Sequence, residues 1–588
     1  MKKQAVWTIL VQCGGLCMSM LRSVLICAVG WAATTATAQN SIPMDCLSGQ
    51  CPGFPPCSVF PAWPSCTVLL TSTGGVVGIN GQNLNGTPLM FWVRRSGLFY
   101  PEQHTFEPTT HGYPTSAILA AQSYSPKVDD QSRVYFKAVL AGVPYDQCPL
   151  VRTAVGGGPL EVLLRPGQPA PWDAAITIQS YARCWQVTRL GRVVVQVQLA
   201  GAGVTAMNDA AFIEFRDGAW LLLAREGDHF WVNGDAEVMR MPTNPYDDCN
   251  VIASESGSYL FRIGVNGSYC NLLMFGELPL STMSPLYTRG PNAALASGEE
   301  MTDMTVRAMD RYFVNAQGDV MFDEVTRTAS GSYVSYHFVK RHDRPLERLH
   351  VSPVQVPAPV SSTMFVDYIQ LSDGGHITLQ GRLANDRWVV MSLAPDNTPR
   401  VVAYEGQATE RGGTMSQQCS ACADAQGNIV LYAWVRKDWQ EGYGVFVWSE
   451  SAGLRDVVLP GDIVYSSGGV PETVEGARVT SEFPEHNGLS SSPKFVSPNG
   501  TYVLSPLRSV DTVTGFYLAS TRDCGDLDFN NDSLFPDPQD VSDFLAVFTG
   551  TACPTPVCDD IDFNNDGLFP DTADIDALLS VFSGGPCL

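Results

Sequence analysis

The sequence predicts a mainly β fold, a β-propeller of seven or eight four-stranded blades, followed by a small α-helical domain at the carboxyl end. Three observations lead to this prediction. A Gly-containing turn recurs about eight times along the middle of the chain, four short strands fit between successive turns, and an acidic double repeat occupies the last segment. Only 16% of residues are charged, whereas Gly (53) and Pro (40) are plentiful, a composition typical of short strands joined by tight turns.

The recurring turn is a polar stretch that ends in Gly and leads into an apolar run. Examples are Ser254-Glu255-Ser256-Gly257 and Ser372-Asp373-Gly374-Gly375. The marker positions, with Ser132 standing where Gly would, are 75, 132, 191, 257, 318, 375, 427 and 500. A second Gly turn follows the first by 31 to 36 residues, at Gly167, Gly227, Gly290, Gly406 and Gly461. Two markers in fixed phase indicate one structural unit repeated along the chain.

One unit shows four alternating runs, at 364–370, 376–383, 387–393 and 399–404. Four strands in about 60 residues fit one propeller blade, and blades that bury both faces on their neighbours explain strands that are apolar beyond simple alternation. The last unit lacks its fourth strand, and we expect a segment near Phe60–Leu70 to complete it and close the ring. An elongated β-solenoid or tandem sandwiches are the alternatives.

The first 38 residues predict export. Arg22 precedes an apolar run at 23–33, and Ala36-Thr37-Ala38 has the form that signal peptidase accepts, so we expect a signal peptide at 1–38 with cleavage after Ala38. The protein is then secreted, extracellular or on the cell surface. The alternative is an N-terminal membrane anchor, although the run is short for a bilayer. No other stretch is long enough, so we expect no membrane span after signal cleavage.

Charge and cysteine content agree with this prediction. The net charge of -23 repels phosphate backbones, so nucleic acid is not an expected partner. Of seventeen Cys, fourteen remain after cleavage, and disulfides are expected in an exported chain. Four of them lie in a Cys/Pro-rich segment at 39–66. Local bridges are expected for Cys148 with Cys184, Cys249 with Cys270, and Cys419 with Cys422, the last as a structural link rather than a redox or zinc site.

The segment 523–588 carries the clearest chemistry. It contains fourteen Asp and no Glu, Lys or Arg, and its two halves align with an offset of 34 residues. Each half has the D-x-N-x-D opening of an EF-hand loop, in which alternating oxygen atoms surround a calcium ion. The predicted ligands are Asp528, Asn530, Asp532, the Leu534 carbonyl, Asp537 and Asp540 in the first half, and Asp562, Asn564, Asp566, the Leu568 carbonyl, Asp571 and Asp574 in the second.

A short helix follows each predicted loop, at 540–548 and 574–582. Apolar residues at helical spacing form one face on each helix, namely Val541, Phe544, Leu545 and Phe548, and Ile575, Leu578, Leu579 and Phe582. We expect the two faces to bury each other and the folding of this domain to depend on calcium. The alternative is an acidic, disordered tail.

These motifs resemble a type I dockerin, specifically the variant whose repeats end in Gly and then Cys, as in Gly584-Gly585-Pro586-Cys587. The resemblance covers about 65 residues and implies calcium as cofactor and a cohesin-like or other surface protein as partner. It favours the disulfides Cys524–Cys553 and Cys558–Cys587. Two departures stand out, a closing acid at loop position 13 instead of 12, and Ser533 where Gly permits the sharp turn in the second repeat.

The middle domain, placed at 67–522, also carries a resemblance. Residues 191–228, with Gly191-Arg192-Val193-Val194-Val195 and Asn208-Asp209-Ala210, are similar to the tandem N-x-x-G-x-V-x-F repeat proteins of secreted bacterial origin. That family has no known function, so the similarity implies a repeated β-fold and identifies no catalytic residues.

The sequence contains no H-E-x-x-H, P-loop, Rossmann or G-x-S-x-G motif. Acids on different blades could still meet at a central channel, and the residues considered for that role are Glu107, Asp209, Glu324 and Asp373. We therefore expect a non-catalytic binding or scaffold protein with a possible carbohydrate or protein ligand on the propeller. The alternatives are a propeller-type carbohydrate-active enzyme, either a glycoside hydrolase or a lyase, and a structural cell-envelope protein.

Overall fold

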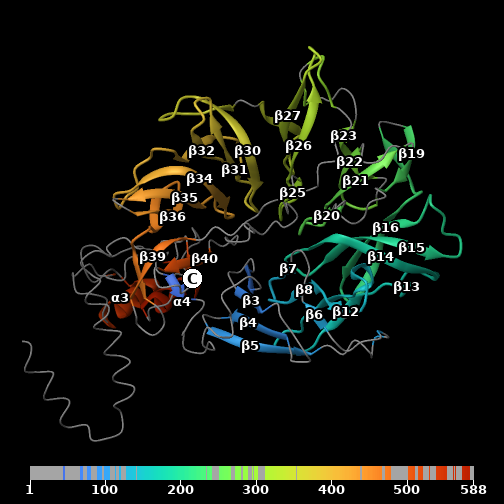
Figure 1. Ribbon diagram of the computed structural model, residues 1–588, viewed down its shortest axis with the longest axis horizontal. Coiled ribbons are helices and arrows are strands. Elements are labelled where there is room, and N and C mark those ends of the chain that lie inside the picture. Colours follow the sequence, from blue (N-terminus) through green and yellow to red (C-terminus); the bar gives the residue numbers. More distant parts are fainter. Residues whose placement is uncertain are drawn as a thin grey trace, which may run out of the picture.

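The computed structural model confirms a mainly β protein (Figure 1). It describes most of residues 127–465 with short gaps, the strands between 44 and 120 and between 471 and 520, and two helices with a few neighbouring residues between 529 and 582. The signal peptide expected at 1–38 lies outside the described residues. Within the described part, no helix has the length and apolar character needed to cross a bilayer.

The described strands form successive sheets along the chain. In order of pairing, the first sheet contains β11 (Gly158–Pro159), β5 (Leu98–Thr105), β4 (Leu89–Arg95), β3 (Val76–Asn80) and β2 (Cys66–Leu70). The second contains β12 (Glu161–Leu164), β10 (Leu150–Arg152), β8 (Val134–Lys137) and β7 (Lys127–Val128). Beside it, β6 (Ile118–Ala120) pairs with β9 (Val139–Leu140), and η2 (Tyr145–Gln147) is a short 3₁₀ turn.

Three sheets follow in the middle of the chain. The third contains β13 (Pro169–Ala170), β14 (Asp173–Val187), β15 (Val193–Gly201), β16 (Ala210–Arg216) and β17 (Ala219–Arg225). The fourth contains β18 (His229–Val232), β19 (Asp235–Arg240), β21 (Tyr259–Val265), β22 (Leu272–Gly276) and β23 (Ser284–Thr288), with β20 (Val251–Ala253) also on β21. The fifth contains β24 (Glu300–Met301), β26 (Val320–Arg327), β27 (Tyr333–Lys340) and β28 (Leu346–Val351), with β25 (Tyr312–Val314) on β26.

Three more sheets complete the series. The sixth contains β29 (Val354–Gln355), β30 (Thr363–Leu371), β31 (Ile377–Leu383), β32 (Trp388–Leu393) and β33 (Pro399–Tyr404). The seventh contains β34 (Thr414–Ala423), β35 (Ile429–Lys437), β36 (Gln440–Ser449) and β37 (Gly453–Val458). The eighth contains β1 (Met44–Cys46), β41 (Thr514–Ser520), β40 (Thr501–Ser509), β39 (Pro471–Ala477) and β38 (Ile463–Tyr465). The four strands predicted in the sixth sheet are confirmed to within one or two residues at each end.

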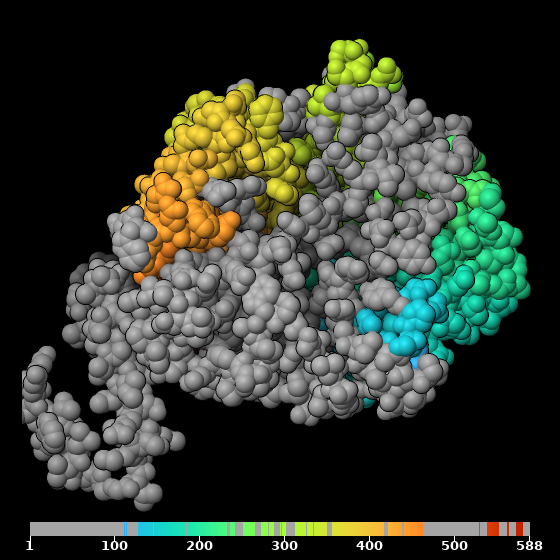
Figure 2. Space-filling model, viewed as in Figure 1, coloured from blue at the N-terminus to red at the C-terminus, as the bar shows by residue number. Residues whose placement is uncertain are grey.

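The sheets follow one another around a common centre (Figure 1), and the coloured residues of Figure 2 trace this circuit from the second sheet to the seventh. The last sheet takes a strand from the other end of the chain, because β1 pairs antiparallel with β41, with Met44 opposite Ala519. An N-terminal strand therefore does complete the last unit. The prediction that a segment near Phe60–Leu70 fills this role was wrong. Residues 44–46 provide the strand, whereas Cys66–Leu70 belongs to the first sheet as the partner of β3.

The hydrophobic core is divided into clusters that lie between consecutive sheets. Val193, Val195 and Val197 of β15 pack against the second sheet, whereas Val194 of the same strand packs against Phe261 and its neighbours in the fourth sheet. All four valines are fully buried. Because both faces of a sheet are covered, both sets of alternating side chains are apolar, as the sequence predicted.

The first sequence marker is the hairpin turn between the first and second strands of a unit. The N–H of Gly191 donates to the Thr188 carbonyl (2.9 Å), and Gly427 bonds Asp424 in the same way (3.2 Å). Asp424 Oδ1 also accepts the N–H groups of residues 426 and 428, at 3.0 and 2.8 Å. This explains why Ser, Thr, Asn or Asp opens each described turn. Ser132 has a φ of 62°, so it adopts the left-handed conformation of the glycines it replaces.

The second marker is the junction between two sheets. The N–H of Gly406 donates to the carbonyl of Met415 on the next sheet (2.8 Å), while Gln407 Oε1 accepts the N–H of Tyr404 (3.1 Å). Gly227 makes the equivalent bond to Met239, at 3.0 Å. The Gly turn therefore attaches the end of one unit to the beginning of the next.

Two of the expected disulfides are absent from the described residues. Cys148 and Cys422 are free, buried thiols. The sulfur of Cys148 lies 3.4 Å from the Pro144 carbonyl instead of bonding Cys184. Cys419 and Cys422 belong to one strand, β34, where three residues span about 10 Å, beyond the reach of a disulfide. Cys249 and Cys270 lie outside the described residues.

Substitution of two glycines of the third sheet tests whether neighbouring turns pack closely, because only one of the two glycines contacts another turn. Gly191 and Gly218 both have a φ of 81°, but a Cβ on Gly191 would lie 2.4 Å from Arg133 Nη2, whereas a Cβ on Gly218 would meet nothing within 4 Å. We expect Gly218→Ala to reduce the free energy of unfolding by about 1 kcal/mol through backbone strain. Gly191→Ala should reduce the free energy of unfolding by ~1–3 kcal/mol more than Gly218→Ala does, because its methyl group overpacks the contact. Urea unfolding measures both values. Equal losses would show that the turns do not pack closely.

Candidate functional site

The two predicted helices are present as α3 (Pro538–Phe548) and α4 (Thr572–Phe582), each beginning two residues before its predicted start. They share a small core in which the ring of Phe544 contacts Phe529 at 5.2 Å and Phe563 at 5.9 Å, measured between ring centroids. Phe529 and Phe563 are separated by 34 residues, so they occupy equivalent positions in the two repeats. The duplication seen in the sequence is therefore a duplication in structure.

Asp540 and Asp574, the acids predicted to close the calcium loops, lie in the first turns of α3 and α4. Each is only 1% exposed. A helix N-terminus favours negative charge, and a buried carboxylate is stable where a cation or hydrogen bonds compensate it. These two residues fit a calcium ligand set, in which they would supply the closing carboxylates.

The remaining predicted ligands lie outside the described residues. They are Asp528, Asn530, Asp532, Leu534, Asp537, Asp562, Asn564, Asp566, Leu568 and Asp571. The same holds for Cys524, Cys553, Cys558 and Cys587, whose pairing stays a prediction.

The apolar helix faces are only partly buried, which corrects the expected packing. Phe544 and Leu578 are fully enclosed, but Leu545 is 37% exposed and Leu579 is 45% exposed. These two leucines are equivalent in the repeat. The core is formed with Phe529 and Phe563 from the preceding loops, so the helices do not need the leucines to cover each other.

At the centre of the sheets, the first-marker turns of successive units contact one another. Asp130 N–H donates to the Arg189 carbonyl (2.9 Å), and Ser256 N–H donates to the Ala316 carbonyl (3.2 Å). Ala316 N–H in turn donates to Asp373 Oδ1 (3.0 Å). Each of these contacts includes a residue two positions before a marker, which is the second residue of its turn. These second residues therefore lie where the turns of different sheets meet.

Arg189 crosses this centre. Its Nη1 donates to Asp373 Oδ2 at 2.9 Å, although the two residues belong to the third and sixth sheets. Its Nε lies 3.6 Å from Asp130 Oδ2, and its N–H donates to the Glu255 carboxylate. Burial raises the pKa of Asp373, while the Ala316 N–H and the Arg189 guanidinium act in the opposite direction. We call Arg189, Asp130, Glu255 and Asp373 the central clasp.

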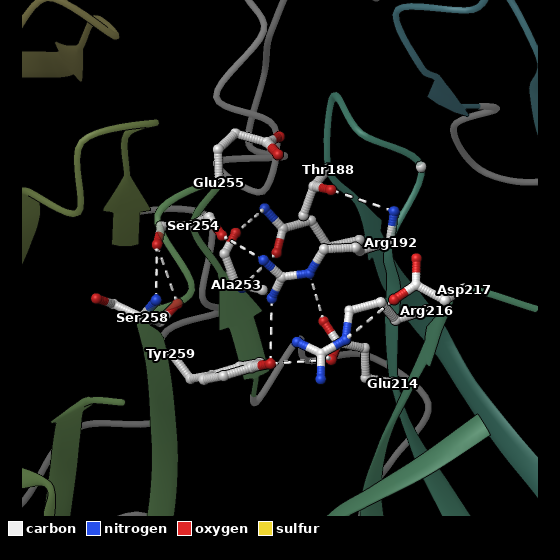
Figure 3. Close-up of polar contacts among 12 residues, drawn as sticks. Thr188, Arg192, Glu214, Arg216, Asp217, Ala253, Ser254, Glu255, Ser258 and Tyr259 are labelled. Atoms are coloured by element: carbon white, nitrogen blue, oxygen red, sulfur yellow. Dashed lines mark hydrogen bonds and ion pairs between the residues drawn. The ribbon is translucent and has the colours of Figure 1, made fainter. Parts of the chain in front are cut away.

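A second polar network links the third and fourth sheets (Figure 3). Arg192 Nε donates to Glu214 Oε1 at 2.6 Å, and Arg192 Nη1 donates to the Ser254 carbonyl at 3.1 Å. The Tyr259 hydroxyl donates to Glu214 Oε2 at 2.9 Å and accepts from Arg192 Nη2 at 3.1 Å. Burial, and then the charge of Glu214, raise the pKa of Tyr259 to about 12. Every charged group of this network has a partner, so its role is to hold the two sheets together.

Three of the four acids considered for catalysis are described, and these three do not converge. Asp373 belongs to the central clasp, Glu324 accepts the hydroxyl of Tyr312 within the fifth sheet, and Asp209 lies beside Glu226 in the third. Glu107 lies outside the described residues. Burial raises the pKa of Glu226 to about 7, with a further contribution from Asp209, while the Met241 N–H opposes the shift and Arg240 Nη1 lies 3.8 Å away.

No protein-family model matches this sequence, and no curated protein matches it. Among solved structures, a prolyl endopeptidase aligns at 10% identity and a TM-score of 0.34, covering 69% of this chain and 54% of its own, so the chain spans about half of that enzyme's length. A polysaccharide lyase aligns at 9% identity (TM-score 0.27; 68% and 91% covered). A lectin from Burkholderia pseudomallei aligns at 10% identity (TM-score 0.27; 67% and 97% covered).

Removing the positive charge of Arg189 should show how much it stabilises the buried carboxylate of Asp373. We expect Arg189→Met to lower the free energy of unfolding by about 1–3 kcal/mol, because Asp373 loses its charged partner. The loss should be greater at pH 8 than at pH 5. Burial raises the pKa of Asp373 and Arg189 opposes this shift, so the pKa rises further in the variant, and the stability that depends on the protonated acid is lost as pH rises. In urea unfolding, Arg189→Met combined with Asp373→Asn should recover part of the loss. Strictly additive effects would contradict the clasp.

Glu226 should make stability pH-dependent. Its pKa of about 7 lies above the ordinary value of 4.5, so its stabilising contribution is complete below pH 4.5 and is lost as pH rises through 7. Glu226→Gln stays neutral and should be more stable than the parent protein at pH 8, by on the order of 2 kcal/mol, but not at pH 4.5. Thermal unfolding across this range measures the difference, and parallel curves would exclude a protonated Glu226.

Proposed function

We propose that this chain is a secreted, non-catalytic binding scaffold, in which a β-propeller recognises a ligand and a calcium-dependent, dockerin-like module attaches the protein to a cohesin-like or other surface protein. The single observation that carries the attachment role is the helix pair in which Asp540 and Asp574 are buried at equivalent first-turn positions. Two copies of one acid-closed turn are what a pair of calcium loops requires.

The proposed propeller has eight blades, one for each of the eight sheets. Three features support it: the core clusters lie between consecutive sheets, the first-marker turns meet at one centre, and β1 joins the last sheet. Closure of a sheet series with a strand from the other terminus removes the exposed edges that an open array would leave.

The exposed leucines support attachment through the helices. Leu545 and Leu579 present the same apolar side chain at the same point of each repeat. The same exposed apolar side chain in both repeats forms a symmetric pair, which favours contact with a partner protein.

Recognition is favoured over catalysis because the three described acids considered for an active site are held in separate structural contacts. Most glycoside hydrolases require two carboxyl groups that flank the bond to be cleaved. The Asp209–Glu226 pair brings two carboxyl groups together, but Glu226 is 5% exposed, which disfavours contact with a substrate.

The calcium role is tested on the full secreted chain by isothermal titration with calcium after chelation. We expect two bound ions and a higher melting temperature of the C-terminal module when calcium is present, because a ligand that binds only the folded form stabilises it. Asp574→Ala should weaken one site roughly tenfold or more, since the closing carboxylate contributes two oxygens.

Asp576→Ala provides the matched control, because Asp576 lies two residues further along α4 and is exposed. It should leave both sites intact. Absence of calcium uptake by the parent chain at millimolar calcium, with its thiols oxidised, would refute the attachment proposal.

A further inference from the structure

The sixth sheet exposes two large aromatic side chains on its first strand. Phe365 is 48% exposed and Tyr368 is 42% exposed, although Met364, Ile369 and Leu371 of the same strand are buried. Met364, Ile369 and Leu371 pack on the preceding sheet. The two aromatic rings therefore belong to the opposite face, which turns toward the seventh sheet, where Gln380 of the neighbouring strand β31 donates to the Ala421 carbonyl at 3.0 Å.

A β-bulge produces this exposure. Val366 pairs with Gly381 and Tyr368 pairs with Gln380, so Asp367 is the additional residue of the bulge. A Cβ on Gly381 would lie 1.9 Å from the Phe365 carbonyl oxygen, so only glycine permits the two strands to approach here. Bulges redirect side chains, and this one places Phe365 and Tyr368 on one face, two register positions or about 7 Å apart.

Charged groups flank the two rings. Arg382 stands opposite Phe365, with its Nε 3.8 Å from Asp367 Oδ2 and its Nη1 3.0 Å from Asp386 Oδ1. The three side chains are 41–81% exposed, so they can exchange water for a ligand. Two carboxylates and one guanidinium leave this surface with a net negative charge. We call Phe365, Asp367, Tyr368, Arg382 and Asp386 the β30 surface.

We propose that the β30 surface binds a neutral polysaccharide, the ligand class that the proposed recognition function leaves open. This inference rests on that proposed function. Both rings are exposed on one face of the sheet, two register positions apart, where the C–H faces of pyranose rings can stack against them. The charged side chains beside them donate to and accept from hydroxyl groups. The excess of carboxylates disfavours acidic glycans.

A peptide is the competing ligand, and the bulge argues against it. Extended peptides usually bind a sheet by adding a strand to a regular edge. β30 pairs with β31 along one edge and with β29 at Thr363 and Met364 of the other, and the bulge at Asp367 bends the strand, so β30 does not offer such a ligand a long, regular edge. Recognition through side chains remains, and the side chains present are aromatic and hydrogen-bonding.

The test is native affinity electrophoresis of the full calcium-loaded chain in gels that contain galactomannan or xyloglucan, with pectin and alginate as acidic counterparts and immobilised casein peptides as the protein ligand. We expect retardation by at least one neutral polysaccharide. Phe365→Ala and Tyr368→Ala should each weaken binding about tenfold, and together they should abolish it. Trp231→Ala removes another exposed aromatic residue, 60% exposed on β18, and should have no effect.

Each other outcome overturns the inference. Absence of retardation by both neutral polysaccharides, retention by the acidic glycans or the casein peptides alone, or equal losses in the Trp231 variant would exclude the β30 surface as a neutral-glycan site. The calcium titration distinguishes this failure from failure of the attachment role. Asp574→Ala should leave polysaccharide binding unchanged, and the β30 variants should bind two calcium ions.

Discussion

The contact between neighbouring hairpin turns is the constraint on which the rest of this structure depends. In the described turns from marker 132 to marker 375, the second residue contacts the turn of another unit, through backbone hydrogen bonds such as Ser256 to Ala316 or through a side chain such as Arg189. Turns that meet in this way fix the angle between consecutive sheets. The core clusters between those sheets then have one arrangement in which both faces are covered.

This constraint explains which parts of the fold could be predicted from sequence. The turn needs Ser, Thr, Asn or Asp to accept backbone N–H groups and a residue with positive φ at its end, so both requirements appear as a pattern at fixed spacing. The apolar runs of the third sheet indicated burial on both faces. Which terminal segment joins the last sheet was not predictable, because β1 is three residues long and its partner is fixed by pairing at the other end of the chain.

The polar sites followed a different logic. The acids of the double repeat stood out because calcium requires oxygen atoms at set intervals. The structure describes two of them, Asp540 and Asp574, as buried residues in the first turns of α3 and α4. Arg189 was missed, since its partner Asp373 is 184 residues away. When the repeats are aligned on their markers, Asp130, Arg189, Glu255 and Asp373 all stand two positions before a marker. Charged residues at one position of several repeats could have indicated this contact. The bulge at Asp367 has no comparable signature, because a single inserted residue shifts alternation in the same way as an ordinary turn.

The pairing of β1 with β41 also determines the order in which the chain can mature. Met44 leaves the ribosome early, but its partner Ala519 is among the last residues of the β domain. β1 therefore stays without its partner until almost the whole chain has been made, and an unpaired strand can pair with other molecules. Closing so long a loop is also slow, because entropy must be lost before any contact compensates it. Completion of the last sheet therefore depends on β1, which is made early and pairs only when β41 has been made.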